Sequence, residues 1–389
     1  MIVVPSEMGR MNKLALLTRV QRMGVASRAD LAKSLGLSQP TCGKIVDDLL
    51  HQGVLEEAEL SNGRDGEPRQ GGRPKLGRPG RTVRLNRSEP RFIGIQLGVT
   101  HTSLTPLALG VSGEDAWQAT FPTPNSAAGW VRELTRAAKQ FNFKPLAGVL
   151  VSVPGILDEP GGRVLFSPNL HWTERVDLSE QVAKVWKAPV VLVQEERALA
   201  LGHQYVTPER EDFLLVDFGD GVGGAVLVAG RLQANPLPIS GELGHTPVHG
   251  NTRPCGCGAV GCLETLVSTR GLIESYAEAR GMPHPTWAEV RTGIGRSGVE
   301  PWLAHSLEAA AVILAGALNV IGLRHVVLTG ALTELPLVAL QYLTHAIQRG
   351  ALWARFGEVE VETAPRRRTA GLVAVGIERL VLSAPADPC

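Results

Sequence analysis

The sequence predicts an α/β protein that begins with a winged helix-turn-helix and continues into a body of two similar α/β lobes with a cleft between them. Three observations predict this architecture. Short, clearly capped helices precede a basic segment within the first ninety residues. The remaining residues then repeat one order of strands and helices. Finally, a stretch rich in cysteine and glycine interrupts the second repeat.

Composition limits the class of protein. The chain has 389 residues, enough for two or three domains. Its apolar content of 44%, with 44 glycines and 26 prolines, is typical of a folded, loop-rich α/β protein. No segment approaches the run of about 18 apolar residues that a membrane helix needs, and the N-terminus has no signal-peptide pattern. Because three of the five cysteines lie in one short stretch, we expect metal binding in a reducing cytoplasm.

The charge is divided unevenly along the chain. Residues 1–90 carry 15 basic and 10 acidic residues, a net charge of +5, whereas the rest carries 24 and 28, a net charge of −4. A basic head on a near-neutral body indicates that the head binds a polyanion.

Three short helices are predicted at the start of the chain. The first covers residues 12–23. Its apolar side is formed by Leu14, Leu16, Leu17 and Val20. The second follows a Ser27 cap and ends at Gly36, and the third follows a Ser38 cap with Pro40 in its first turn. Two short helices joined by a tight turn are the helix-turn-helix layout.

The third helix is the predicted recognition helix. Its buried side consists of Cys42, Ile45, Val46 and Leu49. Its outward, N-terminal side carries Gln39, Thr41, Gly43 and Lys44, where a recognition helix meets base edges. A three-helix packing module without DNA is the alternative.

A basic segment follows the helices. Between Arg69 and Arg87 there are seven basic residues and no acidic one. Arg73 and Arg78 each stand between glycine and proline, in a turn extended enough to place a guanidinium in a minor groove. Since an alternating strand follows, the segment is predicted to be a basic wing, with a solvated linker as the alternative. We place the winged helix-turn-helix at residues 10–88 and the body at residues 89–389.

The body shows two cycles of a strand meander followed by helices and further strands. Strands are expected at residues 91–97, 103–110, 117–121, 147–153, 190–193, 213–217, 225–230 and 325–328. Helices are expected at residues 128–140, 196–205, 271–281, 302–321 and 336–348. A glycine turn at residues 219–224 joins the first two strands of the second cycle.

Residues 241–265, the zinc loop, read GELGHTPVHGNTRPCGCGAVGCLET. They bring together one imidazole, from His245, and three thiols, from Cys255, Cys257 and Cys262. Four nitrogen and sulfur ligands form a closed structural Zn²⁺ site, and the glycines allow the backbone to fold around the ion. Chance proximity or a disulfide is the alternative, but three thiols cannot pair completely among themselves. The sequence therefore predicts structural zinc.

Three segments of the body resemble a known family. PGILDEPGGRVLFSPNLHW, GELGHTPV and CGCGAVGCLE are similar to the signature of the ROK family of repressors, open reading frames and sugar kinases. The resemblance runs from about residue 91 to the C-terminus and implies an actin-like, two-lobed sugar-kinase fold. A winged helix in front of such a body resembles the family's transcriptional repressors, because its kinases usually lack that head.

The chain departs from the family's kinases at the positions that the resemblance implies for catalysis. The first phosphate loop has Gln96 in place of its acid, and the second has Asp220 in place of threonine. In the sugar loop, Gln194 and Glu195 replace asparagine and the aspartate base. Glu195 is one methylene longer than that base, and a misplacement near 1 Å can cost about 10²-fold in rate. The adenosine turn also departs, reading TGA at residues 329–331. We therefore predict a non-catalytic body.

Sugar binding does not require catalysis. The resemblance implies that Glu242, His245 and Glu264 contact a sugar, with Gln194 and Glu195 opposite them. The zinc loop would then hold His245 and Glu264 in place. A modified or acidic sugar met by Arg197 is one effector considered. A vestigial pocket, in which the glutamates only support the loop, is the alternative.

Two functions from different classes follow from these observations. The first is a DNA-binding transcriptional regulator, a repressor that binds a double-stranded operator and responds to a sugar. Two half-sites need two heads, so this function requires a homodimer or homotetramer. The alternative is an ATP-dependent hexose kinase with an accessory DNA-binding head. Neither function involves a membrane.

Overall fold

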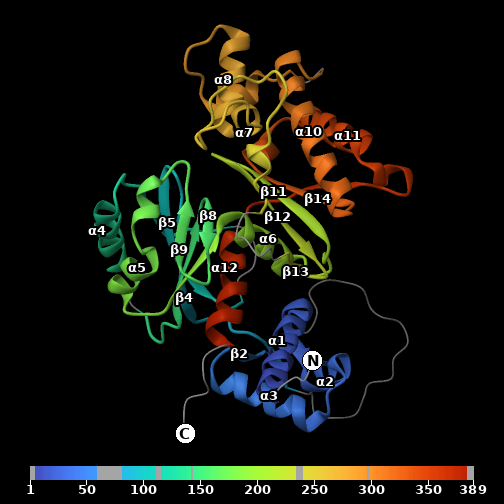
Figure 1. The fold of residues 1–389 in the computed structure, drawn as a ribbon. Helices are drawn as coiled ribbons and strands as arrows, with labels where there is room; N and C mark the ends of the chain where they lie inside the picture. Colours follow the sequence, from blue (N-terminus) through green and yellow to red (C-terminus); the bar gives the residue numbers. More distant parts are fainter. Residues whose placement is uncertain are drawn as a thin grey trace.

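The structure, a computed structural model, describes residues 5–58, 81–110, 115–141, 143–233, 240–295 and 298–382. Within these ranges the chain forms a small head followed by two α/β lobes (Figure 1). Arg73 and Arg78, the two residues of the predicted wing that are expected to contact DNA, lie outside the described residues.

The head contains the three predicted helices, α1 (Pro5–Met23), α2 (Arg28–Leu35) and α3 (Gln39–His51). The predicted caps are confirmed. The Ser27 hydroxyl accepts a hydrogen bond from the Asp30 N–H at 3.1 Å, and the Ser38 hydroxyl accepts one from the Thr41 N–H at 3.3 Å. Helix α2 ends at Gly36, whose φ of 62° favours glycine.

The buried side of α1 differs from the prediction at one residue. Leu16, Leu17 and Val20 are buried, but Leu14 is exposed. Leu14 is two residues from Leu16, about 200° around the helix, so it cannot share the centre of the buried stripe. The predicted core of α3, in contrast, is confirmed at all four positions.

A three-stranded antiparallel sheet completes the head, in the order β1-β3-β2. Its strands are β1 (Ala26–Ser27), β2 (Leu55–Ala58) and β3 (Thr82–Leu85). Only β3 was expected from the alternation of Val83 and Leu85. Strand β1 has only two residues, and the sequence of β2, LEEA, does not alternate apolar and polar residues, so neither strand gives a periodic signal.

The first lobe is built on a five-stranded sheet in the order β10-β7-β4-β5-β6. Its strands are β4 (Pro90–Leu97), β5 (His101–Ala108), β6 (Ala119–Pro122), β7 (Gly148–Val153) and β10 (Val190–Gln194). Strands β4, β5 and β6 form the antiparallel meander, whereas β7 and β10 are parallel to β4. A small hairpin is formed by β8 (Ile156–Asp158) and β9 (Arg163–Phe166). Helices α4 (Ala127–Ala138) and α5 (Leu178–Trp186) lie on the outer side of this lobe (Figure 1).

The second lobe repeats this scheme with the order β13-β12-β11-β14-β15. Its strands are β11 (Phe213–Phe218), β12 (Val222–Val228), β13 (Arg231–Leu232), β14 (His325–Gly330) and β15 (Glu360–Thr363). Again three strands form a meander and two more pair in parallel. Its helices are α7 (Glu264–Val267), α8 (Thr269–Arg280), α9 (Trp287–Gly293), α10 (Pro301–Ile321) and α11 (Leu337–Gly350). The predicted repetition of one α/β scheme is therefore confirmed.

The glycine turn is shorter than predicted. Strand β12 begins at Val222, so Gly223 and Gly224 belong to the strand. Gly224 donates its N–H to the Gly241 carbonyl at 2.7 Å, and a Cβ on Gly241 would lie 1.7 Å from the Gly224 oxygen. The absence of a side chain at Gly241 thus allows the zinc loop to approach β12.

Helices α6 (Glu195–Val206) and α12 (Arg368–Gly376) cross between the two lobes (Figure 1). Two glycines make the crossing close. A Cβ on Gly202 would lie 1.8 Å from the Arg367 carbonyl oxygen, and one on Gly371 would lie 1.7 Å from the Ala198 oxygen. One hydrophobic core joins this helix pair to the head, since it contains Leu16 and Leu31 together with Ala198 and Leu372.

Helix α10 is the one helix among the described residues that is long and apolar enough to cross a membrane. Leu303, Leu307, Leu314 and Leu318 are fully buried in the core of the second lobe. Helix α10 therefore serves as a core helix of that lobe.

Candidate ligand cleft and metal centre

A cavity of about 220 Å³ lies where the strands of both lobes end. The first lobe contributes the ends of β4, β7 and β9, and the second contributes the β11–β12 turn and the zinc loop. The N-terminal ends of α6 and α12 meet at the cavity through Glu195, Glu196 and Arg368. Its charged and amide side chains are Gln96, Asn169, Gln194, Glu195, Glu196, Asp217, Asp220, Glu242, Glu264, Arg366 and Arg368.

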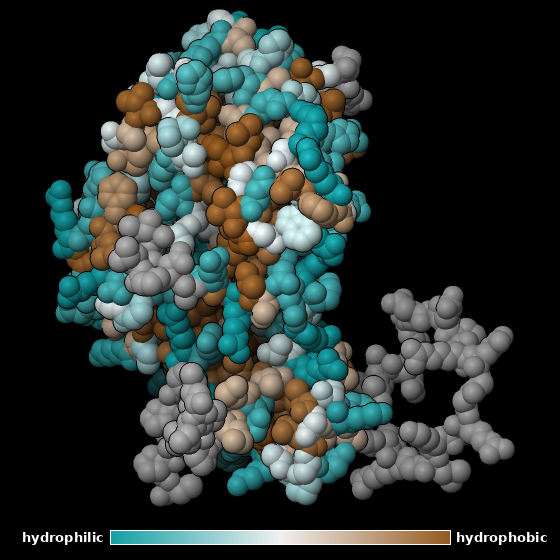
Figure 2. Space-filling view, turned by 45° about the vertical axis from the view of Figure 1, so that its right-hand side comes forward, coloured by the Kyte–Doolittle hydropathy of each residue, from teal (hydrophilic) through white to brown (hydrophobic). Residues whose placement is uncertain are grey.

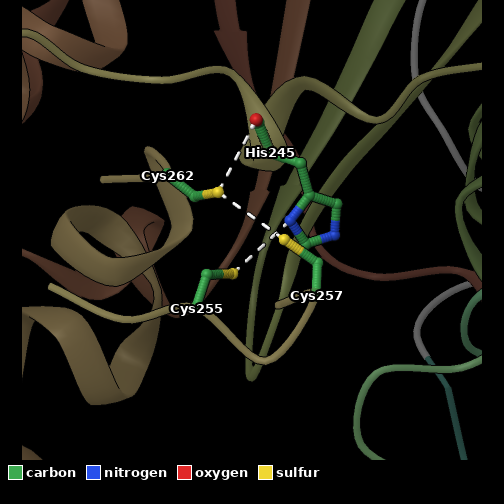
Figure 3. A group of neighbouring side chains, drawn as sticks. All are labelled: His245, Cys255, Cys257 and Cys262. Carbon is green, nitrogen blue, oxygen red and sulfur yellow. Dashed lines mark hydrogen bonds between the residues drawn. The ribbon is translucent and has the colours of Figure 1, made fainter. Parts of the chain in front are cut away.

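Four potential metal ligands of the zinc loop converge beside this cavity (Figure 3). One donor atom from each of His245, Cys255, Cys257 and Cys262 lies within 4.8 Å of all the others. The Cys257 and Cys262 sulfurs are 3.7 Å apart, and the Cys255 sulfur is 3.6 Å from His245 Nδ1. Ligands about 2.3 Å from one tetrahedral ion are separated by roughly 3.5–3.8 Å.

The chemistry of these four donors fits Zn²⁺. Burial, followed by hydrogen bonding among the thiols, raises the pKa of Cys262 to about 12, and burial also raises the pKa of Cys255. Three adjacent thiolates need a compensating cation, which a divalent ion supplies.

Arg253 ties the zinc loop to the helices that follow it. Its Nη1 donates a hydrogen bond to the Thr265 carbonyl at 2.9 Å, and its Nη2 forms an ion pair with Glu278 at 2.7 Å.

The side chains predicted to contact a sugar lie together. Gln194 Nε2 is 3.5 Å from Glu242 Oε1, and His245 Nε2 is 3.8 Å from Glu242 Oε2. Glu264 Oε2 accepts the Val222 N–H at 3.0 Å, while its Oε1 is 3.8 Å from the Cys255 sulfur. Because His245 presents Nδ1 to the thiols and Nε2 to Glu242, its imidazole lies between the metal cluster and the cavity.

Glu195 lines the cavity but is already paired. Its carboxylate accepts hydrogen bonds from Arg368 Nε, at 2.8 Å, and from Arg368 Nη2. Arg368 also lies 3.6 Å from Asp115, which accepts the Thr369 N–H at 2.8 Å. This ion pair occupies the carboxylate at the family's base position.

A second arginine, Arg366, lies in the cavity beside the β11–β12 turn. Arg366 binds Asp217 with both Nε and Nη2, at 2.7 and 2.8 Å. A Cβ on Gly219 would lie 2.2 Å from the same guanidinium, so Arg366 lies directly against the β11–β12 turn. Asp220 is exposed at the tip of that turn.

Arg197 does not line the cavity. Its Nε lies 3.3 Å from Glu159, which also pairs with Arg379 at 2.6 Å and accepts the Gln194 N–H. Arg197 follows Glu195 by two residues, about 200° around α6, so its side chain leaves the helix away from Glu195 and toward Glu159. The considered contact between Arg197 and an acidic sugar therefore has no support in this arrangement.

Several residues of the cavity were not identified from the sequence. Asn169 lies within the family-like segment, so its motif was a usable signal. Arg366 and Arg368 lie in a run of three arginines that precedes an unpredicted helix, and no motif links them to the sugar loop. Glu196 directly follows Gln194 and Glu195 of the sugar loop, but no sugar contact was predicted for it.

The predicted DNA-contacting residues of α3 are accessible. Gln39, Thr41 and Lys44 are exposed at its N-terminal end, while Gly43 is half-buried. The Thr41 hydroxyl is 2.8 Å from the Ser38 hydroxyl, so part of its hydrogen-bonding capacity is used by the helix cap.

Known proteins share this body. The ROK family model matches residues 92–382. The xylose repressor of Caldicellulosiruptor bescii is 27% identical over 277 residues, which are 68% of this chain and 65% of the repressor. The chain therefore matches less than two thirds of that relative's length.

Two solved structures have a similar fold. One is a ROK family transcriptional regulator described as a homologue of the E. coli MLC protein, with a TM-score of 0.73 and 17% identity over 96% of this chain and 98% of the other. The other is the ROK hexokinase of Thermus thermophilus, with a TM-score of 0.60 and 22% identity over 74% of this chain and 97% of the other.

Proposed function

The chain belongs to the ROK family, and from that premise we propose that it is a DNA-binding transcriptional repressor whose operator affinity depends on a sugar bound in the cleft. The observation that carries this proposal is the packing of the head onto the helix pair α6 and α12, whose N-terminal ends line the cleft. The similarity to a ROK transcriptional regulator, which covers nearly the whole of both chains, supports it.

We propose that residues 10–88 form a winged helix-turn-helix. The order of helices α2 and α3 followed by the β2–β3 ribbon supports this proposal. Helix α3 would enter the major groove with Gln39, Thr41 and Lys44 toward the bases. Arg73 and Arg78 would add contacts to phosphates or the minor groove from the connection between β2 and β3.

Contacts at the far end of α6 provide a route from the cleft to the head. Gln21 of α1 donates a hydrogen bond to the Tyr205 carbonyl, and Arg22 pairs with Glu211 at 2.9 Å. The Tyr205 hydroxyl in turn donates to the Leu109 carbonyl at 2.6 Å. A sugar that changes the angle between the lobes would therefore move the surface on which the head packs.

The zinc loop would serve both structure and sensing. We propose that Zn²⁺ binds His245 Nδ1 and the thiolates of Cys255, Cys257 and Cys262. His245 Nε2, Glu242, Glu264, Gln194 and Glu195 would then face the sugar. Fixing the imidazole on a metal orients its second nitrogen toward a ligand, as an outer partner orients a metal-bound histidine.

The hexose kinase alternative has less support. Its base would be Glu195, whose carboxylate is held by Arg368, and its second phosphate loop carries Asp220 beside the Arg366–Asp217 pair. We therefore propose that the body is non-catalytic, although kinases of the family share its fold.

We propose that the repressor acts in the cytoplasm as a homodimer or larger oligomer. Two valines are exposed on the outer side of α10, Val312 by 69% and Val320 by 89%. The 3-10 helix η4 (Leu352–Arg355) packs beside the end of α10, because Asn319 accepts the Leu352 N–H at 2.7 Å, and exposed Phe356 follows it. Hydrophobic side chains also gather on the face shown in Figure 2. A second copy of the chain would cover this apolar surface.

The test is selection of random DNA duplexes by the full-length protein, followed by titration of the selected sequence at several salt concentrations. We expect a preferred, two-fold-related sequence and an affinity that falls as salt rises. Lys44→Ala should weaken binding, and Arg78→Ala should also lower the salt dependence if it contacts phosphate. Lys139→Ala, on the body, is the matched control. Recovery of no preferred sequence would rule out the repressor.

A further inference from the structure

We propose that the effector is an amino sugar, bound as the cation with its ammonium group beside Glu196. This inference rests on the proposed sensing function, because it names the class of ligand that the same cleft takes. Three observations carry it: the engagement of both arginines of the cleft, the position of the Glu196 carboxylate, and the excess of acids around it.

The described residues of the cleft offer no free arginine or lysine to an acidic ligand. Arg366 and Arg368 are the basic side chains, other than His245, among the described residues that line it. Arg366 makes a bidentate pair with Asp217, and Arg368 pairs with Glu195 and approaches Asp115. A phosphate or carboxylate on the ligand would have to displace one of these internal carboxylates.

Glu196 lacks the partner that its buried oxygen requires. Its Oε2 atom is buried and has no hydrogen-bond partner in the described part of the chain. The side chain lines the cleft beneath β12, where a Cβ on Gly223 would lie 2.7 Å from Glu196 Oε1. A buried carboxylate oxygen without a donor is costly, so a ligand that brings an N–H donor to this point would be favoured.

The surroundings of Glu196 favour a positive group. The cleft is lined by the carboxylates of Glu195, Glu196, Asp217, Asp220, Glu242 and Glu264. Only Glu195 and Asp217 are paired with its arginines. The other acids around Glu196, which are Asp220, Glu242 and Glu264, favour an ammonium group over an anion. A neutral sugar gains hydrogen bonds there but no charge interaction.

The protonation of Glu196 allows a second measurement, the release of a proton when the ligand binds. Burial, reinforced by the negative charges of Glu195, Glu242 and Asp217, raises the pKa of Glu196 well above its usual value. This shift favours the protonated carboxyl in the free protein. An ammonium group would bind to the carboxylate, and the displaced proton would pass to the solvent: carboxylic acid plus ammonium gives an ion pair and one H⁺.

The experiment is isothermal titration calorimetry of the full-length protein near neutral pH with four probes. Two carry an amine, glucosamine and 6-amino-6-deoxyglucose, and two do not, glucose and glucose 6-phosphate. We expect at least one amino sugar to bind roughly tenfold or more tightly than glucose, and glucose 6-phosphate to bind most weakly. Repeating the titration in two buffers of different ionisation enthalpy should show proton release with the amino sugar only.

Glu196→Gln keeps the shape of the side chain and removes its charge. We expect this variant to bind the amino sugar no more tightly than glucose and to release no proton. Glu180→Gln, on the exposed side of α5, is the matched control. Equal binding of glucose and both amino sugars by the unaltered protein, or tighter binding of glucose 6-phosphate, would overturn the inference without requiring any variant to fold.

Operator binding separates this inference from the proposed function. If glucose or its phosphate releases the protein from its selected DNA and the amino sugars do not, the repressor stands and the amino-sugar inference is wrong. If no probe binds, the inference is wrong and the sensing role loses support, while DNA binding is still judged by the selection experiment.

Discussion

Arg368 donates a hydrogen bond from Nε to the Glu195 carboxylate at 2.8 Å, which joins the first turns of α12 and α6. A glutamate at a helix N-terminus is favoured by the helix dipole, whereas an arginine there is not. Glu195 and Asp115 offset that cost, because both place negative charge beside the guanidinium. The pair therefore holds both helices at the cleft.

Removing this arginine should destabilise the body. Arg368→Met leaves Glu195 and Asp115 without their cation in a site where all three side chains are largely buried. We expect a loss of about 3 kcal/mol in the free energy of unfolding, measured by urea denaturation at neutral pH. Arg136→Met, which breaks an exposed pair with Glu133, should cost less than about 1 kcal/mol. A similar loss in both variants would contradict this role.

The crossing of α6 and α12 should not tolerate a methyl group. Gly371→Ala would place a Cβ 1.7 Å from the Ala198 oxygen, so one helix must shift. We expect a cost of about 1–3 kcal/mol, together with a change in the sugar dependence of operator binding. Gly9→Ala is the control, because nothing lies within 4 Å of its Cβ in α1. Unchanged thermal stability of Gly371→Ala would show that the helices are not held this closely.

The metal site can be tested by composition and by stability. We expect elemental analysis to find about one zinc ion per chain, and Cys257→Ser to lose it and unfold at a lower temperature. Cys42→Ala is a suitable control, because Cys42 is buried in the head, far from the zinc loop in sequence, and should leave the zinc content unchanged. Full zinc occupancy in Cys257→Ser would argue against the four-ligand site.

The sequence alone was sufficient to predict features that depend only on neighbouring residues. The caps at Ser27 and Ser38 need only a few neighbouring residues, as does the ligand set of the zinc loop, and the structure places each of them as expected. The two strand cycles were also predicted, since buried strands are continuous apolar runs.

The sequence alone was insufficient to predict contacts between residues that are far apart in the chain. Glu195 and Arg368 are 173 positions apart, and no local pattern connects them. Helix α12 was missed because its glycines and valines are weak helix formers. It is stabilised by the close approach to α6 that Gly202 and Gly371 allow. Arg197 was considered for the cleft because sequence position does not reveal which way a side chain leaves a helix.

A buried histidine should make the protein sensitive to acid. Burial lowers the pKa of His203 to about 4, and neither ring nitrogen has a hydrogen-bond partner within the described ranges. Glu362 opposes this shift, whereas Arg367, His325 and Arg210 reinforce it. The unfolded chain, with an ordinary histidine pKa near 6.5, therefore binds more protons than the folded chain between these values.

Stability should accordingly be complete above about pH 6.5 and fall as the pH drops toward 4, by about 2 kcal/mol at pH 5 from this residue alone. His203→Leu removes the titrating group from a site beside Phe213 without breaking a hydrogen bond. Urea denaturation at about pH 7.5 and 5.0 should show a smaller loss in His203→Leu than in the unaltered protein, while the exposed His101→Gln behaves as the unaltered protein does. An equal loss of stability in both variants and in the unaltered protein would mean that other groups cause the acid sensitivity. His325, whose pKa burial also lowers and which interacts with His203, would then be the first candidate.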